Sequence, residues 1–193
     1  MRKVILEEWI SLDGYAVDGE GSLDFFTEAG EDRKSDMDQL AFLEGVDTIL
    51  LGRKTYELFV DFWPTASTDE ELVADRLNDL PKLVFSNTLS EAPWGTWPPA
   101  QVVRGDAVAE IGRLKEQDGK HMVVWGSLTL AQDLMSADLI DEYRIHLCST
   151  LVGGGRPLFA PREGHVNLER VDVQTYDTGA LFLHYEPKGE ASP

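Results

Sequence analysis

Hydrophobic runs and amphipathic stretches alternate along the first part of the chain. The run from Val4 to Ser11 is rich in β-branched and aromatic residues and predicts a strand that ends before Asp13. Turn-forming residues then dominate up to Gly30. Apolar positions at helical spacing predict a helix over residues 35–44, and a second strand is expected at residues 48–51, so the order is strand, helix, strand.

The same alternation continues to residue 148. Thr68 followed by Glu71 predicts a capping box for a helix that Pro81 ends. The segment 92–100 holds too many prolines for regular structure, so its tryptophans are expected in a packed surface loop. The remaining predicted elements are strands at residues 82–86, 101–104, 121–125 and 142–148, and helices at residues 107–117, with Asp106 as N-cap, and 128–137.

Two alternating segments flank Asp177–Gly179 near the C-terminus and predict an antiparallel hairpin that closes the sheet. Residues 188–193 are expected to form a loose tail. Alternating strands and helices followed by a hairpin predict an α/β fold with a mostly parallel central sheet and an antiparallel edge. Residues 1–187 are expected to form a single domain, because no linker or internal repeat divides them.

The composition limits the classes of partner. The chain has 193 residues, of which 42% are hydrophobic, and a formal net charge of -18 from 35 acidic and 17 basic residues. Such a charge argues against binding to nucleic acid or to anionic membranes. The single cysteine, Cys148, permits no intrachain disulfide, and the N-terminal segment lacks the apolar run of a signal peptide or membrane span. A soluble cytoplasmic protein that acts on a small molecule is expected.

Two predicted junctions between a strand and a helix carry the candidate chemistry. In TILLGRKTY, Gly52 ends an apolar run and Arg53, Lys54 and Thr55 follow, while in VVWGSLTLAQDL the corresponding glycine is Gly126. Glycine lets a ligand approach the backbone, and cations with free helix N–H groups suit phosphate oxygens. The alternatives are a solvated turn at the first junction and simple helix initiation at the second, with Ser127 as N-cap. Both junctions should lie at the carboxyl edge of one sheet, where ligands bind.

Several familiar site motifs are absent from the sequence. A P-loop would need glycine where Asp47 stands and lysine where Arg53 stands. GEGSLD and GGGRPL lack the third glycine of a dinucleotide-binding fingerprint, and no G-x-S-x-G elbow occurs. The four histidines are scattered without metal-ligand spacing, so no metal site is expected. A bound redox cofactor is therefore the remaining source of chemistry.

The run from Val123 to Phe159, together with SLDGYA and TILLGRKTYE, resembles the dihydrofolate reductase-like superfamily, closest to the C-terminal reductase domain of riboflavin biosynthesis enzymes. The resemblance implies a three-layer α/β/α domain and an NADPH site. By that resemblance, the 2′-phosphate and pyrophosphate would contact the first junction, the adenosine end the next strand, and the pyrophosphate the second junction. The implied cofactor residues are Gly52, Arg53, Lys54 and Thr55; Ser86 and Asn87; and Gly126, Ser127, Leu128 and Thr129.

Trp125 departs from the family pattern, because paired or triple glycines often stand at this point in related chains. The indole could pack in the core, or it could narrow the nicotinamide end of the site and change which substrates fit.

Three residues are candidates for catalysis. In dihydrofolate reductases a helix carboxylate binds the pterin ring, and the matching interval before Gly52 reaches Asp36, with Asp38 close enough to compete; acids at a helix start also suit the helix dipole. In the riboflavin-type reductases the aspartate of SLDG contacts substrate, which indicates Asp13, although a turn aspartate explains it equally. His146 is the third candidate, with a buried, hydrogen-bonded histidine as its alternative.

The sequence therefore predicts an NADPH-dependent reductase of a small heterocyclic or sugar-derived compound, most like 5-amino-6-(5-phosphoribosylamino)uracil reductase. A dihydrofolate or pteridine reductase is the enzymatic alternative. The alternative from another class is a non-catalytic nucleotide-binding dimer. Apolar edge strands and the segment 153–159 could contribute to a homodimer surface.

Overall fold

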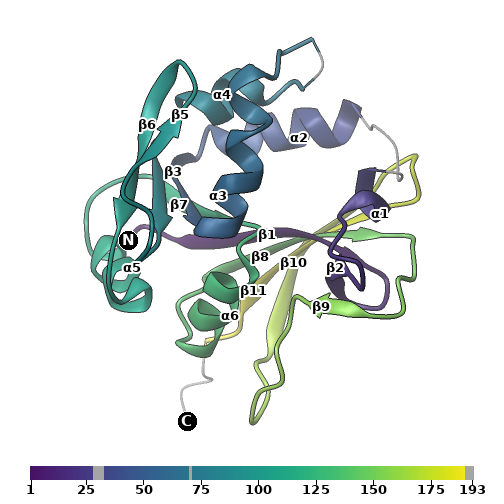
Figure 1. Cartoon of the computed structure of the whole chain (residues 1–193). Coiled ribbons are helices and arrows are strands. Elements are labelled where there is room, and N and C mark those ends of the chain that lie inside the picture. The colour runs from purple at the N-terminus through teal and green to yellow at the C-terminus, as the bar shows by residue number, and fades with distance from the viewer. Residues whose placement is uncertain (28–32, 70, 190–193) are drawn as a thin grey trace.

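The computed structural model describes residues 1–27, 33–69 and 71–189 (Figure 1). Its strands are β1 (Val4–Ser11), β2 (Tyr15–Asp18), β3 (Val46–Gly52), β4 (Lys82–Phe85), β5 (Ala92–Trp94), β6 (Trp97–Val103), β7 (His121–Trp125), β8 (Glu142–Cys148), β9 (Gly155–Pro157), β10 (Leu168–Thr175) and β11 (Leu181–Pro187). The helices are α1 (Asp24–Thr27), α2 (Arg33–Leu43), α3 (Arg53–Val60), the 3-10 turn η1 (Trp63–Thr65), α4 (Ala74–Asp79), α5 (Ala107–Lys115) and α6 (Leu128–Ser136).

The large sheet has the strand order β10-β11-β8-β1-β7-β3-β4-β6-β5. The six strands from β8 to β6 are parallel, β5 is antiparallel at one edge, and the β10–β11 hairpin is antiparallel at the other. Helix-containing crossovers join most consecutive parallel strands, whereas β4 is joined to β6 through β5. The predicted fold class is confirmed, since the sheet is mostly parallel and ends in an antiparallel C-terminal hairpin.

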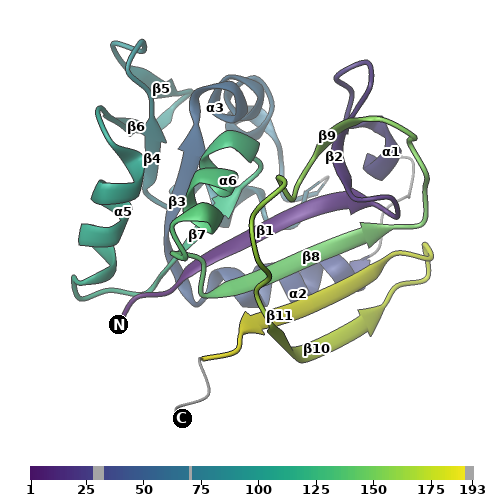
Figure 2. The same cartoon turned by 90° about the horizontal axis from the view of Figure 1, so that it is seen from below.

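Helices cover both faces of this sheet. Figure 1 shows α2, α3 and α4 on one face and α5 and α6 on the other, and Figure 2 shows α5 and α6 in front of the sheet. Each face has its own core: one contains Leu43, Leu51 and Trp125, and the other contains Leu6, Ile111 and Leu134. The predicted three-layer arrangement follows from burial of both sheet faces.

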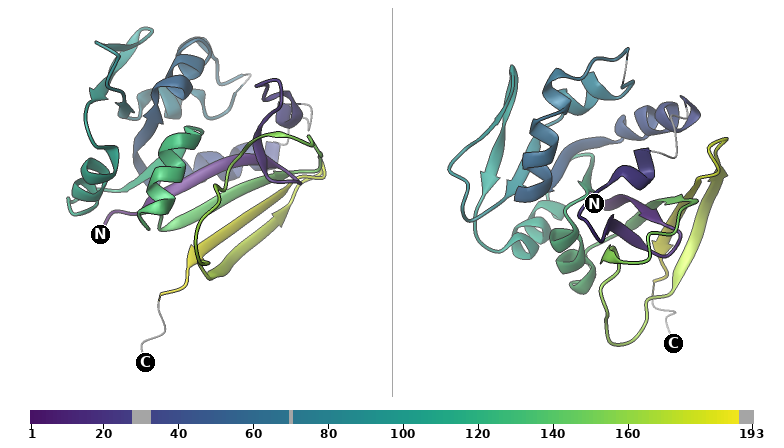
Figure 3. Two further views of the ribbon diagram at one scale, coloured as in Figure 1. Left: turned by 60° about the horizontal axis from the view of Figure 1, so that its bottom comes forward. Right: turned by 45° about the vertical axis from the view of Figure 1, so that its right-hand side comes forward.

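A short antiparallel ribbon of β2 and β9 lies beside the carboxyl end of β1 (Figure 3). Strand β2 and helix α1 fall in the stretch that the sequence predicted as turns up to Gly30, and that prediction is wrong for both. Ala16 and Phe25 explain the regular structure, because both are buried and contribute apolar area to the core. Gly30 itself lies outside the described residues.

The proline-rich segment 92–100 is not an irregular loop, as predicted, but the hairpin of β5 and the first half of β6. Trp94 is completely buried, and its Nε1 donates a hydrogen bond of 2.6 Å to Oδ1 of Asn78. Prolines are tolerated here because an edge strand leaves N–H positions that pair with no neighbour. Burial of the indole therefore outweighs the poor strand propensity of proline.

The predicted capping box at Thr68 is also wrong. Helix α4 starts at Ala74, and its N-cap, Val73, makes no side-chain capping bond. Ala74 and Leu77 are buried, so packing rather than a cap sets where this helix begins. By contrast, Asp106 caps α5 as predicted, because its side chain accepts a hydrogen bond from the N–H of Ala109.

The C-terminal strand ends as the sequence predicted. Strand β11 reaches Pro187, and the N–H of Lys188 donates to the carbonyl oxygen of Asn167 at 2.8 Å. The rest of the predicted loose tail, from residue 190 on, lies outside the described residues. Within the described part of the chain, every helix is too short or too polar to cross a membrane.

Candidate functional site

The predicted cofactor residues lie along one edge of the sheet. Strands β7, β3 and β4 are adjacent and parallel, so their carboxyl ends meet at the same edge. Residues 126–129 follow β7, residues 52–55 follow β3 and residues 86–87 follow β4. We call these three segments the junction edge. Ligands of open parallel sheets bind at such an edge.

Reciprocal hydrogen bonds join the first two segments of the junction edge. The N–H of Gly52 donates to Oγ of Ser127 at 2.8 Å, and the N–H of Ser127 donates to Oγ1 of Thr55 at 2.8 Å. Ser127 occupies the N-cap position of α6 but makes no capping bond, which corrects the prediction of a simple N-cap. Its backbone is left-handed, with φ 58°, an uncommon and strained conformation for a residue with a side chain.

Gly126 is required where the two junctions meet. Its φ of 54° is left-handed, and a Cβ atom there would lie 2.9 Å from Cγ2 of Thr55. Only glycine combines that backbone conformation with so close an approach. Gly126, which was predicted to let a ligand approach the backbone, therefore also lets the first turn of α3 pack closely against it.

Four cations lie along this edge. Arg53 is exposed and forms two hydrogen bonds, of 2.7 and 3.0 Å, with the carboxylate of Glu57 one helical turn later. Lys54 is exposed beside it. Two cations were not predicted: Arg156 donates to Oγ1 of Thr129 at 3.3 Å, and Arg104 donates to the carbonyl oxygen of Asn87 at 3.0 Å. The signal for Arg156 was the segment GGGRPLF, which the sequence suggested only as a dimer surface.

The segment after β4 is organised by its own polar atoms. Oγ of Ser86 accepts hydrogen bonds from the N–H groups of Thr88 and Leu89, and Oδ1 of Asn87 accepts one from the N–H of Gly105. These bonds fix the loop at the junction edge, where Ser86 and Asn87 were predicted to lie by the adenosine end.

The junction edge fits the phosphates of a dinucleotide. No side chain among the described residues caps the N-terminus of α3 or α6, so their first N–H groups remain available. Arg53, Lys54 and Arg156 stand beside those helix ends and offer charge-assisted hydrogen bonds to phosphate oxygens. In a chain with net charge -18, this concentration of cations favours an anionic ligand.

A buried carboxylate lies next to the junction edge, on the face covered by α2. Oε2 of Glu7 accepts hydrogen bonds of 2.7 Å from Nε2 of Gln39 and from Nε1 of Trp125, the residue before Gly126. Oε1 accepts a 3.0 Å bond from Nε of Arg144 and lies 3.4 Å from Nε2 of His146. Burial alone would raise the pKa of Glu7, but the hydrogen bond with His146 and the charge of Arg144 outweigh it and lower the pKa to about 2.

Sequence reasoning missed Glu7, because Glu7 and Glu8 interrupt an apolar strand and look like solvent-facing positions. No local signal shows that its partners arrive from α2, β7 and β8. The core-packing interpretation of Trp125 is confirmed, since its ring is buried with the core under α2. The same indole also orients the carboxylate of Glu7.

Glu8 lies on the opposite face of β1, between the core residues Leu6 and Ile10. Its Oε1 accepts a 3.1 Å hydrogen bond from the N–H of Trp9, and its Oε2 is buried without a partner among the described residues. Burial raises the pKa of Glu8 to about 8, against a smaller lowering by the Trp9 bond. Two successive carboxyl groups of β1 are therefore held in opposite protonation states at neutral pH.

His146 lies in an aromatic setting beside Glu7. Its ring stacks on Trp9, with centroids 4.1 Å apart and planes 6° apart, and Phe182 lies 5.2 Å away. The ring is buried, which agrees with the alternative that the sequence left open for this residue. It also borders a pocket of about 210 Å³ that is lined by parts of α2, β8, β10 and β11. We call this the helix pocket.

Of the two helix carboxylates considered from sequence, Asp38 lines the helix pocket and Asp36 does not. Oδ2 of Asp38 and Oε1 of Gln39 are buried and find no hydrogen-bond partner among the described residues. The amide of Gln39 must turn its nitrogen toward the ionised Glu7, so its oxygen remains an acceptor. Two neighbouring residues of α2 therefore each offer this pocket a hydrogen-bond acceptor that no described residue satisfies.

Asp13 holds a loop. Its carboxylate accepts hydrogen bonds from Oγ of Ser11 at 2.7 Å and from the N–H groups of Val152 and Gly153 at 3.2 and 2.8 Å. The Ser11 bond, followed by the backbone bonds, lowers the pKa of Asp13 despite some desolvation. This geometry matches the turn interpretation and joins the end of β1 to the loop before β9.

The strand order and the position of the junctions define a dihydrofolate reductase-like domain. A dihydrofolate reductase from Enterococcus faecalis, complexed with NADP(H), superposes with a TM-score of 0.61 over 97% of both chains at 14% identity, which concerns the fold alone. More specifically, the chain belongs to the RibD C-terminal domain family, which matches residues 2–182.

Two similar proteins cover nearly the whole chain. YyaP of Bacillus subtilis (strain 168), an uncharacterized protein, is 28% identical over 191 residues, 97% of this chain and 96% of YyaP. A crystal structure from Shewanella sp. PV-4, provisionally named a riboflavin biosynthesis protein, has a TM-score of 0.78 at 27% identity and covers 97% of this chain and 99% of that one.

Proposed function

We propose that the protein is an NADPH-dependent reductase of a small nitrogen heterocycle. One observation carries the proposal: the hydrogen-bonded junctions with their cations lie directly beside the buried Glu7 network, because Trp125 donates to Glu7 and its carbonyl oxygen accepts a hydrogen bond from Oγ of Ser127. Membership of the RibD C-terminal domain family and the NADP(H) complex of the E. faecalis protein support the same cofactor. A cytoplasmic location and a homodimer remain predictions.

Cofactor binding and proton delivery would take place in two neighbouring parts of the protein, the junction edge and the Glu7 network. Arg53, Lys54 and Arg156 would hold the phosphates of the cofactor at the junction edge, with the first N–H groups of α3 and α6. A bound reduced nicotinamide supplies the hydride. Glu7 would keep Trp125 and His146 in place, and His146, which lines the helix pocket, would be the group that delivers a proton to the acceptor.

The helix pocket favours a heterocycle with N–H donors. Oδ2 of Asp38 and Oε1 of Gln39 have no hydrogen-bond partner among the described residues, and ring or amino N–H groups of a substrate would supply one. Arg144, the one arginine in the lining, is bound to Glu7 and stacked between Phe42 and Phe182, 3.9 and 4.5 Å from the ring centroids. Among the described lining residues no other arginine or lysine is present to bind a phosphate, so the favoured acceptor is unphosphorylated, unlike 5-amino-6-(5-phosphoribosylamino)uracil.

The cofactor assignment is tested by titrating NADPH and NADH while following the fluorescence of the five tryptophans. Replacing Arg53 by alanine should weaken NADPH binding by roughly 1.5–3 kcal/mol and leave NADH binding nearly unchanged, because Arg53 would contact the 2′-phosphate. Arg113→Ala is the matched control, since Arg113 is also an exposed helical arginine paired with a glutamate but lies on α5.

Failure of the wild-type protein to bind either nucleotide would contradict the proposal. Binding of NADPH without oxidation by any pyrimidine or pterin would instead favour the non-catalytic nucleotide-binding dimer. Oxidation of NADPH by dihydropterins alone would favour the pteridine reductase alternative, in which Asp38 would bind the ring.

A further inference from the structure

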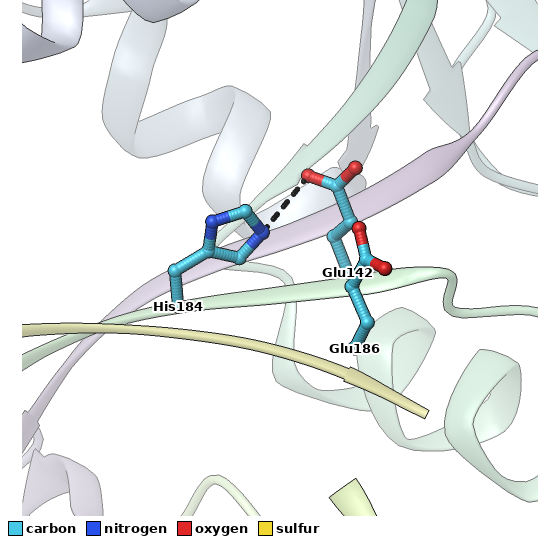
Figure 4. Close-up of side chains that lie close together, drawn as sticks. All are labelled: Glu142, His184 and Glu186. Atoms are coloured by element: carbon cyan, nitrogen blue, oxygen red, sulfur yellow. Dashed lines mark ion pairs between the residues drawn. The ribbon is translucent and has the colours of Figure 1, made fainter. Parts of the chain in front are cut away.

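Three side chains able to bind a metal meet at the sheet edge opposite the junction edge. Glu142 begins β8, and His184 and Glu186 lie near the end of β11, which runs antiparallel beside it. One ligand atom from each residue lies within 4.8 Å of the other two, and Figure 4 shows the three side chains converging. They come from neighbouring strands of one sheet, so the backbone holds their spacing.

The histidine has the geometry of a metal ligand rather than of a hydrogen bond donor. Nε2 of His184 lies 3.3 Å from Oε2 of Glu142, yet it is buried and makes no hydrogen bond with any described residue. Two ligands of a tetrahedral zinc ion, each about 2.1 Å from the metal, lie about 3.4 Å apart. The separation of these two atoms therefore matches a shared ion, and a buried polar atom without a partner calls for one.

In this structure the ammonium group of Lys3 neutralises part of the charge of the Glu142 and Glu186 carboxylates. Its Nζ lies 2.5 Å from Oε1 of Glu142 and 3.0 Å from Oε1 of Glu186. The Lys3 side chain is 39% exposed. Ion pairs of a partly exposed cation contribute little to stability. An incoming divalent ion can therefore displace the ammonium group into solvent at small cost.

We propose that Glu142, His184 and Glu186 form a binding site for a divalent transition metal ion, with Lys3 as the cation that the metal displaces. One imidazole nitrogen and two carboxylate oxygens suit Zn²⁺, Mn²⁺, Fe²⁺ or Co²⁺, whereas an all-oxygen set would suit Mg²⁺ or Ca²⁺. The ion would join β8 to β11 and stabilise the side of the sheet that carries the helix pocket, which His184 also lines.

The test is calorimetric titration of Zn²⁺ into tag-free protein near pH 7.5, with circular dichroism to verify folding. The wild-type chain should bind one ion. His184→Ala should weaken the affinity at least about tenfold, because one of three ligands is lost. Lys3→Met should strengthen it about tenfold, because the competing ammonium group is gone. His165→Ala, at an exposed histidine in the loop before β10, is the matched control and should leave the affinity unchanged.

Equal zinc affinity in wild-type and His184→Ala protein would overturn the proposal, and so would an absence of binding in Lys3→Met. If His184→Ala fails to fold, Glu186→Gln replaces it with the same expected loss, since Glu186 is less buried. The site is remote from the junction edge and zinc affinity is measured without nucleotide or acceptor, so the outcome is independent of whether the protein is a reductase.

Discussion

At the scale of the residue, β1 places two glutamates on opposite faces with opposite protonation states. Glu7 is ionised among donors from three elements, while Glu8 is protonated in an apolar setting. No periodicity argument separates these neighbours, because the sequence shows only two acids in an apolar run. The difference arises from partners that lie more than 30 positions away along the chain.

The raised pKa of Glu8 makes stability depend on pH. Between the unfolded pKa near 4.5 and the folded pKa of about 8, the folded state binds more protons, so stability falls as pH rises through this range. Glu8→Gln removes this dependence. In urea unfolding, the free energy of unfolding of the variant minus that of wild type should therefore increase from pH 5 to pH 8, by a few kcal/mol at most. Glu163→Gln, in an exposed loop, is the control, and its free energy of unfolding relative to wild type should not change with pH. If the free energy difference between Glu8→Gln and wild type did not change with pH, the raised pKa of Glu8 would be contradicted.

At the scale of the element, two strand-to-helix junctions about 70 residues apart in sequence are joined by hydroxyl groups. The sequence predicted correctly that both would lie at the carboxyl edge of one mostly parallel sheet. It could not predict that Oγ of Ser127 would accept from the N–H of Gly52 and Oγ1 of Thr55 from the N–H of Ser127, because that depends on how closely α3 and α6 approach across the edge. The same limit hid Arg156, whose contact with Thr129 requires the β2–β9 ribbon.

Thr55→Val should loosen this joint. Valine keeps the shape of threonine but leaves the N–H of Ser127 without an acceptor, which should lower the free energy of unfolding by about 1–2 kcal/mol. NADPH affinity should fall as well, since residues 126–129 lose their fixed position. Thr55→Ser retains the hydroxyl group and should stay close to wild type in both urea unfolding and fluorescence titration. Equal behaviour of the two variants would show that the hydroxyl contributes nothing.

At the scale of the whole molecule, the fold class was predictable from alternating patterns and family resemblance. The errors fell where tertiary packing overrides local propensity: Trp94 draws a proline-rich segment into the sheet, and buried Ala74 sets the start of α4. The structure gives two of the three catalytic candidates a position that the sequence alone did not show. Asp13 accepts hydrogen bonds from the loop before β9, and Asp38 rather than Asp36 lines the helix pocket. The catalytic assignments themselves stay predictions.

The charge of the whole chain leads to a prediction of its own. A net charge of -18 opposes compaction through mutual repulsion, which salt screens. Raising ionic strength from 0.01 to 0.15 M shortens the Debye length from about 30 to about 8 Å. The urea midpoint should therefore rise over this range with NaCl and equally with choline chloride. A midpoint that falls with salt would show that local ion pairs outweigh the overall repulsion.

The strand order also has a consequence for synthesis of the chain. Strands β1 and β3 emerge first from the ribosome, but they never pair with each other, because β7 lies between them. Until residue 125 has been made, a nascent chain keeps the facing edges of both strands unpaired, and such edges invite association with other chains. Insertion of β7 closes this gap and, by the same event, brings the two junctions together. Competence to bind the proposed cofactor would thus mark the moment when the gap between β1 and β3 has closed.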